Sequence, residues 1–178
     1  MTGSDFISRS PEETTEKGRE LARSLTAPVL VLLSGDLGTG KTTFTKGIIG
    51  ALGAAEESEV TSPTFTLVHV FQTPANIGEG SAPGSSAFAN RRVKVYHVDL
   101  YRVEGFNDLA TLDLEDALSE PAIVIIEWSE RFSLRSDWPR IYITLEHLEG
   151  DSRHITISTP VLPEEPGTLA PPRFLPQS

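Results

Sequence analysis

The sequence contains no cysteine, which excludes a disulfide scaffold, a thiolate metal site and a cysteine nucleophile. It also lacks an apolar run long enough to cross a bilayer, and its longest apolar runs have the length of buried strands. Residues 1–10 have no apolar core of the kind that a signal peptide needs. We therefore expect a cytoplasmic protein that has no membrane partner.

Basic residues are scarce as well. The chain has 15 lysines and arginines against 25 aspartates and glutamates, which gives a formal net charge of -10. The densest basic group is Arg91, Arg92 and Lys94. Such a surface repels polyanions unless its basic residues cluster, so we do not expect this chain alone to bind nucleic acid tightly. Solubility is the simplest role for the acidic excess.

The sequence does have the apolar segments of a single domain. Its 178 residues, of which 38% are hydrophobic, suffice to bury a sizeable core. Ser10 and Glu13 have the spacing of a capping box around Pro11, which predicts a helix over 10–25. The other expected elements are strands over 29–33, 65–71, 93–100 and 123–126, helices over 42–52 and 106–118, and a hairpin of 140–148 with 153–159.

Two segments lack this periodicity. Residues 73–92 are rich in Gly, Ser, Pro and Ala, which predicts a flexible loop inserted in the domain. Residues 161–178 are rich in Pro, and we expect them to form a flexible tail. The predicted domain therefore covers residues 1–160.

A phosphate-binding motif lies between the strand over 29–33 and the helix over 42–52. Residues 35–42 match the pattern G-x-x-x-x-G-K-[ST] in full. Its glycines let successive backbone N–H groups point at phosphate oxygens, and the helix N-terminus adds N–H groups of its own. The buried strand before the motif and the helix after it favour a nucleotide site over a chance glycine-rich turn. The predicted nucleotide-binding residues of this loop are Asp36, Leu37, Gly38, Thr39, Gly40, Lys41, Thr42 and Thr43.

Three side chains are candidates for the chemistry on this loop. Lys41 would reach the β- and γ-phosphates, and the Thr42 hydroxyl would bind Mg²⁺. Glu127 ends a run of four apolar residues, as in a Walker B strand, and Asp99 also ends a predicted strand. We assign Glu127 to Mg²⁺ and Asp99 to positioning water, although these two could exchange roles. Each could instead be an ordinary acid at a strand-to-loop turn.

Other residues have weaker indications. Thr64 lies where P-loop proteins place a switch segment and could sense the γ-phosphate, although a Ser-Pro turn that opens a strand explains its setting as well. We interpret His97 as a structural histidine rather than a catalytic one. Trp128 is expected to pack beside the site, as a core residue in preference to a shelf for adenine. Arg102 could reach a phosphate or form a surface ion pair.

Four segments in this order resemble one family. They are 35–44 (GDLGTGKTTF), 62–67 (SPTFTL), 96–102 (YHVDLYR) and 127–128 (EW). From about residue 10 to 159 the chain is similar to the bacterial ATPases of tRNA threonylcarbamoyladenosine biosynthesis, the TsaE or YjeE family. The first segment is generic to P-loop proteins, whereas the second and third in this order are specific to the family.

The resemblance implies an α/β P-loop NTPase with a mixed, mostly parallel sheet flanked by helices and a C-terminal antiparallel hairpin. It implies weak hydrolysis of Mg-ATP that supports the placing of threonylcarbamate on adenosine-37 of tRNA. The implied partners are the threonylcarbamoyl transferase subunit and its non-catalytic paralogue. These partners would hold the tRNA and perform the transfer, and the ATP cycle would reset the complex between turnovers.

The resemblance also carries roles onto single residues. Mg²⁺ ligation falls on Thr42 and Glu127, and nucleotide contact falls on the P-loop and Asp99. Local similarity places further nucleotide contacts at the start of the first helix and in the hairpin, on Ser10, Pro11, Glu12, Ser152 and Arg153. The loop over 73–92 is longer than the family's usual turn, and the tail is additional.

Two other classes of P-loop protein stay open. A small-molecule kinase would need a lid that bears arginines to close over ATP, and no arginine-rich lid segment is evident. A GTPase would carry an Asn-Lys-x-Asp motif to read guanine, and this motif is absent from the sequence.

Overall fold

The computed structural model describes residues 2–63, 67–74, 92–105, 108, 119–159 and 173–175. Two α-helices, one short 3-10 helix and nine strands occur in these ranges. In chain order they are β1 (Thr2–Ser8), α1 (Pro11–Ala22), β2 (Val29–Ser34), α2 (Lys41–Ala51), β3 (Val68–Gln72), β4 (Lys94–Asp99), β5 (Ile123–Glu127), η1 (Ser129–Arg131), β6 (Ser133–Arg135), β7 (Arg140–His147), β8 (Arg153–Thr159) and β9 (Arg173–Leu175).

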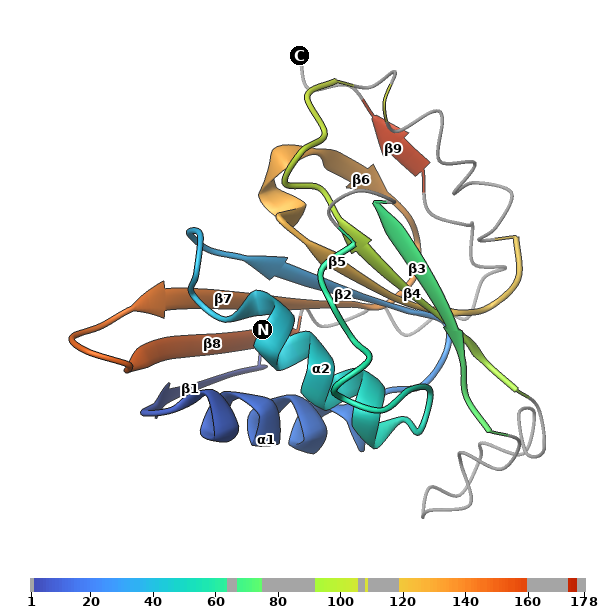
Figure 1. The fold of residues 1–178 in the computed structure, drawn as a ribbon. Helices are drawn as coiled ribbons and strands as arrows, with labels where there is room; N and C mark the ends of the chain where they lie inside the picture. The colour runs from blue at the N-terminus through green and yellow to red at the C-terminus, as the bar shows by residue number, and fades with distance from the viewer. Residues whose placement is uncertain are drawn as a thin grey trace.

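Seven strands form one mixed sheet in the order β1-β8-β7-β2-β5-β4-β3. The four central strands, β7, β2, β5 and β4, are parallel, whereas β3, β8 and β1 join at the edges in antiparallel pairs. Helices α1 and α2 lie together on one side of this sheet, and the small β6–β9 pair lies on the other (Figure 1). The predicted α/β class, the mostly parallel sheet and the C-terminal hairpin of β7 with β8 are confirmed.

Strand β2 shows why the sheet is buried on both faces. Side chains of a strand alternate between faces, and those of β2 divide between two apolar clusters. Val29, Val31 and Leu33 pack in the cluster that includes Phe44 of α2. Leu30 and Leu32 pack in the opposite cluster, which includes Trp138. A strand at the centre of this sheet therefore requires an uninterrupted apolar run. A strand with one face in solvent would instead alternate apolar and polar residues.

The two helices run side by side in the same direction at unusually short range (Figure 1). Glycines on their facing sides make this approach possible. A Cβ at Gly18 would lie 2.2 Å from the Phe44 carbonyl oxygen, and one at Gly47 would lie 2.0 Å from the Thr15 carbonyl oxygen. Ser10 caps α1 by accepting the Glu13 N–H at 3.2 Å, as the capping spacing predicted.

The structure corrects some expected boundaries. The strand predicted over 65–71 begins at Val68, because Leu67 has a φ of 60° and leaves the extended conformation. Strands β1, β6 and β9 were not predicted. The helix predicted over 106–118, most of the loop predicted over 73–92 and most of the predicted tail lie outside the described residues. Within the described ranges, no helix is long and apolar enough to cross a membrane.

We predict that Gly47→Ala destabilises the protein. In a helix interior, alanine is normally more stable than glycine by about 1 kcal/mol. Here, however, the alanine Cβ would collide with the Thr15 carbonyl oxygen. Overpacking of this kind costs about 1–3 kcal/mol, so the free energy of unfolding in a urea titration should fall.

Gly105→Ala is the matched control, because nothing lies within 4 Å of a Cβ at that position. An equal loss in both variants would mean that helix contact is not the cause.

Candidate functional site

The parallel pairing of three strands brings the candidate residues to one edge of the sheet. In the register of β4 and β5, Asp99 lies beside Glu127. In the register of β2 and β5, Glu127 lies beside Leu33, two residues before the P-loop begins at Gly35. This carboxyl edge is where ligands bind in open α/β sheets.

Residues 35–40 form a turn that needs glycine. Gly35 has a φ of 132° and Gly40 a φ of 100°, values that other residues rarely adopt. A Cβ at Gly35 would also lie 2.1 Å from the Leu145 carbonyl oxygen. Gly40 is the N-cap of α2, and no side chain caps the helix there. The helix therefore presents its first turn to the loop without a competing side-chain acceptor, as a phosphate site requires.

The ammonium of Lys41 lies inside this turn. Its Nζ donates to the carbonyl oxygens of Gly35 and Asp36, both at 2.7 Å. The same atom lies 3.7 Å from the ring centroid of Trp128, within the range of a cation–π contact. Burial lowers the pKa of Lys41 below its ordinary value, although nearby carboxylates, first that of Glu127, act in the opposite direction. The loop is thus built around a positive charge with little access to water.

The carboxylate of Glu127 is held between two donors from different elements. Its Oε2 accepts the Thr42 hydroxyl at 2.8 Å, and its Oε1 lies 2.7 Å from Nε2 of His97. All but 2% of the Glu127 surface is buried. Mg²⁺ is commonly held by one or two protein oxygens with phosphate and water completing its shell. The Thr42 hydroxyl and the Glu127 carboxylate are oxygens of this kind at the mouth of the P-loop, so the residues present fit the ion.

Asp99 is also buried and held by the chain around it. Its Oδ1 accepts the Tyr101 N–H at 2.9 Å, and its Oδ2 accepts the Ser62 hydroxyl. The backbone N–H of Asp99 donates to Leu67 at 3.1 Å. Ser62 and Leu67 therefore both meet the sheet edge at Asp99. Thr64, the predicted γ-phosphate sensor, lies between these two residues in the chain but outside the described residues.

The hairpin of β7 and β8 covers the other side of the loop. A Cβ at Gly40 would lie 2.7 Å from Nη1 of Arg153, so this guanidinium sits directly on the P-loop. His147 places its Nε2 3.3 Å from the Leu37 carbonyl oxygen. Ser152 lies in the turn before Arg153, where its carbonyl oxygen accepts the Leu148 N–H. The structure thus brings Arg153 to the predicted site.

The start of α1 lies beside the start of α2. The hydroxyl of Thr15 approaches the Thr43 carbonyl oxygen at 3.5 Å, and this contact places the predicted residues 10–12 near the P-loop. Ser10 bonds within its own turn, and Pro11 and Glu12 are exposed. Among the described residues, no hydrogen bond joins residues 10–12 to the loop.

Two roles at the site were missed by sequence reasoning. Ser62 was treated as part of a turn, yet it donates to Asp99. His97 was interpreted as a structural histidine without a link to the site, yet it contacts Glu127. Strand alternation does place His97 and Asp99 on one face, but the register that brings Glu127 beside them is not readable from local pattern.

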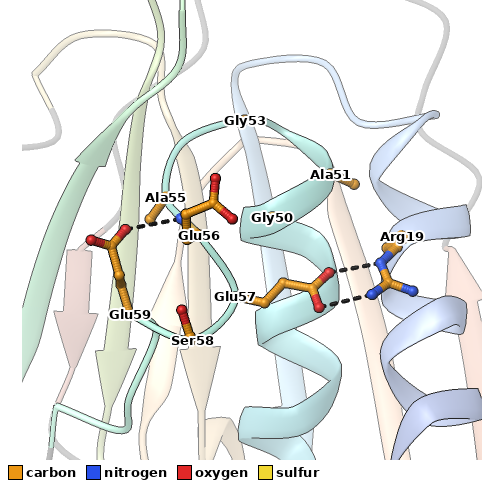
Figure 2. A pocket seen from close by; sticks show the side chains of 9 residues that line it. All are labelled: Arg19, Gly50, Ala51, Gly53, Ala55, Glu56, Glu57, Ser58 and Glu59. Atoms are coloured by element: carbon orange, nitrogen blue, oxygen red, sulfur yellow. Dashed lines mark hydrogen bonds and ion pairs between the residues drawn. The ribbon is translucent and has the colours of Figure 1, made fainter.

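A separate pocket of about 760 Å³ lies at the other end of α2. Figure 2 shows Glu57 reaching across it to form a paired ion contact with Arg19, at 2.7 and 2.8 Å. Gly50, the first residue of α2 that lines this pocket, follows the last P-loop residue Thr43 by seven positions, a distance of roughly 10 Å at 1.5 Å per residue. The pocket therefore does not belong to the candidate phosphate site.

Comparisons with known proteins agree on one relationship. The profile of the family "Threonylcarbamoyl adenosine biosynthesis protein TsaE" matches residues 8–155. The chain is similar to tRNA threonylcarbamoyladenosine biosynthesis proteins TsaE from Treponema pallidum, at 31% identity over 85% of this chain and 98% of that protein, and from Rickettsia bellii, at 34% identity over 89% and 96%. The crystal structure of Bacillus subtilis YdiB matches with a TM-score of 0.56 at 25% identity, and covers 89% of this chain and 86% of that one.

We predict that Ser62→Ala lowers the free energy of unfolding by about 1.5–3 kcal/mol, the range for a hydrogen bond to a charged group. The variant leaves the buried Asp99 carboxylate with one donor fewer. Chemical denaturation measures the change.

Ser24→Ala serves as the control, because its hydroxyl bonds the Leu21 carbonyl oxygen in an exposed position and its loss should stay within about 0.5 kcal/mol. If the two variants behave alike, Asp99 does not depend on Ser62.

Proposed function

Since the chain belongs to the TsaE family of threonylcarbamoyl adenosine biosynthesis proteins, we propose that it acts in that pathway as an ATPase. The family places it in tRNA threonylcarbamoyladenosine biosynthesis, and its fold is that of a P-loop nucleotide-binding protein. The proposal is that the chain binds Mg-ATP on residues 35–43 and hydrolyses it slowly.

One observation carries this proposal. The Thr42 hydroxyl, at the start of α2, bonds the Glu127 carboxylate at the end of β5, next to an ammonium buried in the loop. Positive charge, a helix N-terminus and a carboxylate thus converge at one point. This combination suits a phosphate chain that carries a divalent cation.

Each residue then has a defined task. Lys41 exchanges its two carbonyl acceptors for phosphate oxygens. Thr42 and Glu127 hold Mg²⁺, which when bound neutralises charge on the phosphates. Asp99 orients water near the end of the phosphate chain, and its two donors keep its carboxylate in place. Arg153 adds positive charge from the side of the hairpin.

The residues at the ends of other elements complete the proposed nucleotide site. We propose further nucleotide contacts for Ser10, Pro11 and Glu12 at the start of α1, for Ser152 in the hairpin turn, and for Thr64, which lies outside the described residues. Slow hydrolysis is expected of the isolated chain, since the rate of such sites depends strongly on groups that a partner protein can supply.

We propose that those partners are the threonylcarbamoyl transferase subunit and its non-catalytic paralogue. The net charge of -10 disfavours direct contact with tRNA, so tRNA would reach this chain only through the complex. The ATP cycle would reset the complex, and the transfer to adenosine-37 would occur on the partner.

Lys41→Ala should weaken binding of Mg-ATP by about 10- to 100-fold while the fold stays intact, because charged hydrogen bonds contribute about 1.5–3 kcal/mol each. Titration calorimetry measures the affinity, and circular dichroism measures the fold. Lys46→Ala, on the same helix but outside the loop, is the control and should bind as the original protein does.

Global unfolding of Lys41→Ala would mean that Lys41 has a structural role instead. Unchanged affinity would remove the nucleotide site from the loop.

The partner proposal has its own test. The purified chain, mixed with the transferase and its paralogue and with Mg-ATP, should elute with them as one complex in size-exclusion chromatography. Bovine albumin in place of the two partners controls for nonspecific association. Failure to bind Mg-ATP together with failure to form the complex would end the proposal. Rapid phosphorylation of a metabolite by the chain alone would favour the kinase alternative.

A further inference from the structure

We propose that His97 is a positioning residue, which holds the Glu127 carboxylate in the orientation that directs its second oxygen at Thr42. The inference deepens the function proposed above and rests on it, because Thr42 and Glu127 are the residues proposed to hold Mg²⁺. The side chain of His97 has its hydrogen bond with Glu127 rather than with a residue of the loop.

The place of His97 in the sheet supports this role. It lies in β4, two residues before Asp99, and therefore on the same face of the strand. Its side chain is completely buried. Its Nε2 lies 2.7 Å from Oε1 of Glu127 on the neighbouring strand β5. The contact thus links the two strands that carry the site's acids.

The direction of this hydrogen bond follows from the surroundings of the ring. A carboxylate has no proton, so Nε2 carries the hydrogen and donates. Nδ1 is buried and has no hydrogen-bond partner among the described residues. A proton on Nδ1 would leave a buried donor unpaired, at a cost of about 1–3 kcal/mol. A ring that carries its hydrogen on Nε2 therefore fits these surroundings better than one that carries it on Nδ1.

This bond divides the tasks of the two carboxylate oxygens. Oε1 is occupied by His97, and Oε2 accepts the Thr42 hydroxyl at 2.8 Å. A carboxylate held at both oxygens has one orientation. Without the His97 donor, the buried Glu127 would keep a single partner and could turn about its last torsion, which is broad in energy. Removing His97 should therefore weaken the Mg²⁺-dependent part of nucleotide binding.

The test compares His97→Phe, which keeps a ring but has no donor, with His97→Gln, whose amide N–H lies at roughly the distance of Nε2. Nucleotide affinity is measured by calorimetry with Mg²⁺ and again with a chelator. His97→Phe should reduce the Mg²⁺-dependent gain in affinity about 10- to 100-fold, as outer-shell changes at metal sites do. Its affinity without metal should be unchanged, and His97→Gln should recover most of the gain.

His69→Gln is the matched control. His69 lies across from His97 in the β3–β4 register, with ring centroids 6.4 Å apart, and it should leave the gain unchanged. In a Glu127→Gln background, His97→Phe should have no further effect on the gain. An equal loss in both backgrounds, or a full gain in folded His97→Phe, overturns the inference.

A measurement on the unaltered protein tests the hydrogen bond from His97 to Glu127 even if His97→Phe does not fold. Nitrogen NMR of ¹⁵N-histidine protein should show the His97 hydrogen on Nε2, and a hydrogen on Nδ1 alone overturns the inference. Failure of the proposed role of His97 can be distinguished from failure of the proposed function. If the original protein shows no Mg²⁺-dependent gain in affinity, the proposed function fails. If it shows the gain and His97→Phe keeps it, only the role of His97 fails.

Discussion

Parallel pairing of β2, β5 and β4 is the constraint on which the site depends. Residues 35–43, Asp99 and Glu127 are far apart along the chain, and each follows or ends one of these strands. Because parallel strands end at the same edge, their pairing alone brings the P-loop and both acids together. Antiparallel pairing of β4 with β5 would place Asp99 at the opposite edge. The apolar residues of these strands therefore position the candidate site as well as forming the core.

The second constraint is the close packing of α1 against α2. Gly18 and Gly47 let backbone meet backbone, and this approach sets the start of α1 beside the start of α2. Two helix N-termini then lie at the same end of the sheet, each with partial positive charge. On the other side of the loop, the β7–β8 hairpin brings Arg153 onto Gly40. The P-loop therefore lies between the uncapped N-terminus of α2 and the guanidinium of Arg153, in a chain whose net charge is -10.

Burying charge is costly unless each charged group has partners. Here Lys41 has two carbonyl oxygens and an aromatic ring. Glu127 has Thr42 and His97, and Asp99 has Ser62 and a backbone N–H. Such preorganisation holds polar groups in place before a ligand arrives. The same hydrogen bonds connect β4 with β5, β5 with α2, and β4 with Ser62. A ligand that displaces one of these polar groups would therefore disturb contacts between several elements.

Local sequence pattern was enough to predict much of the fold of this protein. The P-loop motif, the buried strands, the capped first helix and the final hairpin are each encoded within about 20 consecutive residues or fewer, where periodicity and turn residues act. The edge strand β1, the late start of β3 at Val68 and the contact of Ser62 with Asp99 could not be read in this way. Each depends on the register or approach of segments that are distant in sequence. His97 illustrates the difference: its residue type and strand are visible in the sequence, but its partner Glu127 is 30 residues away and is chosen by how β4 aligns with β5. That alignment is settled only when the whole core packs, because no short stretch of chain contains both strands.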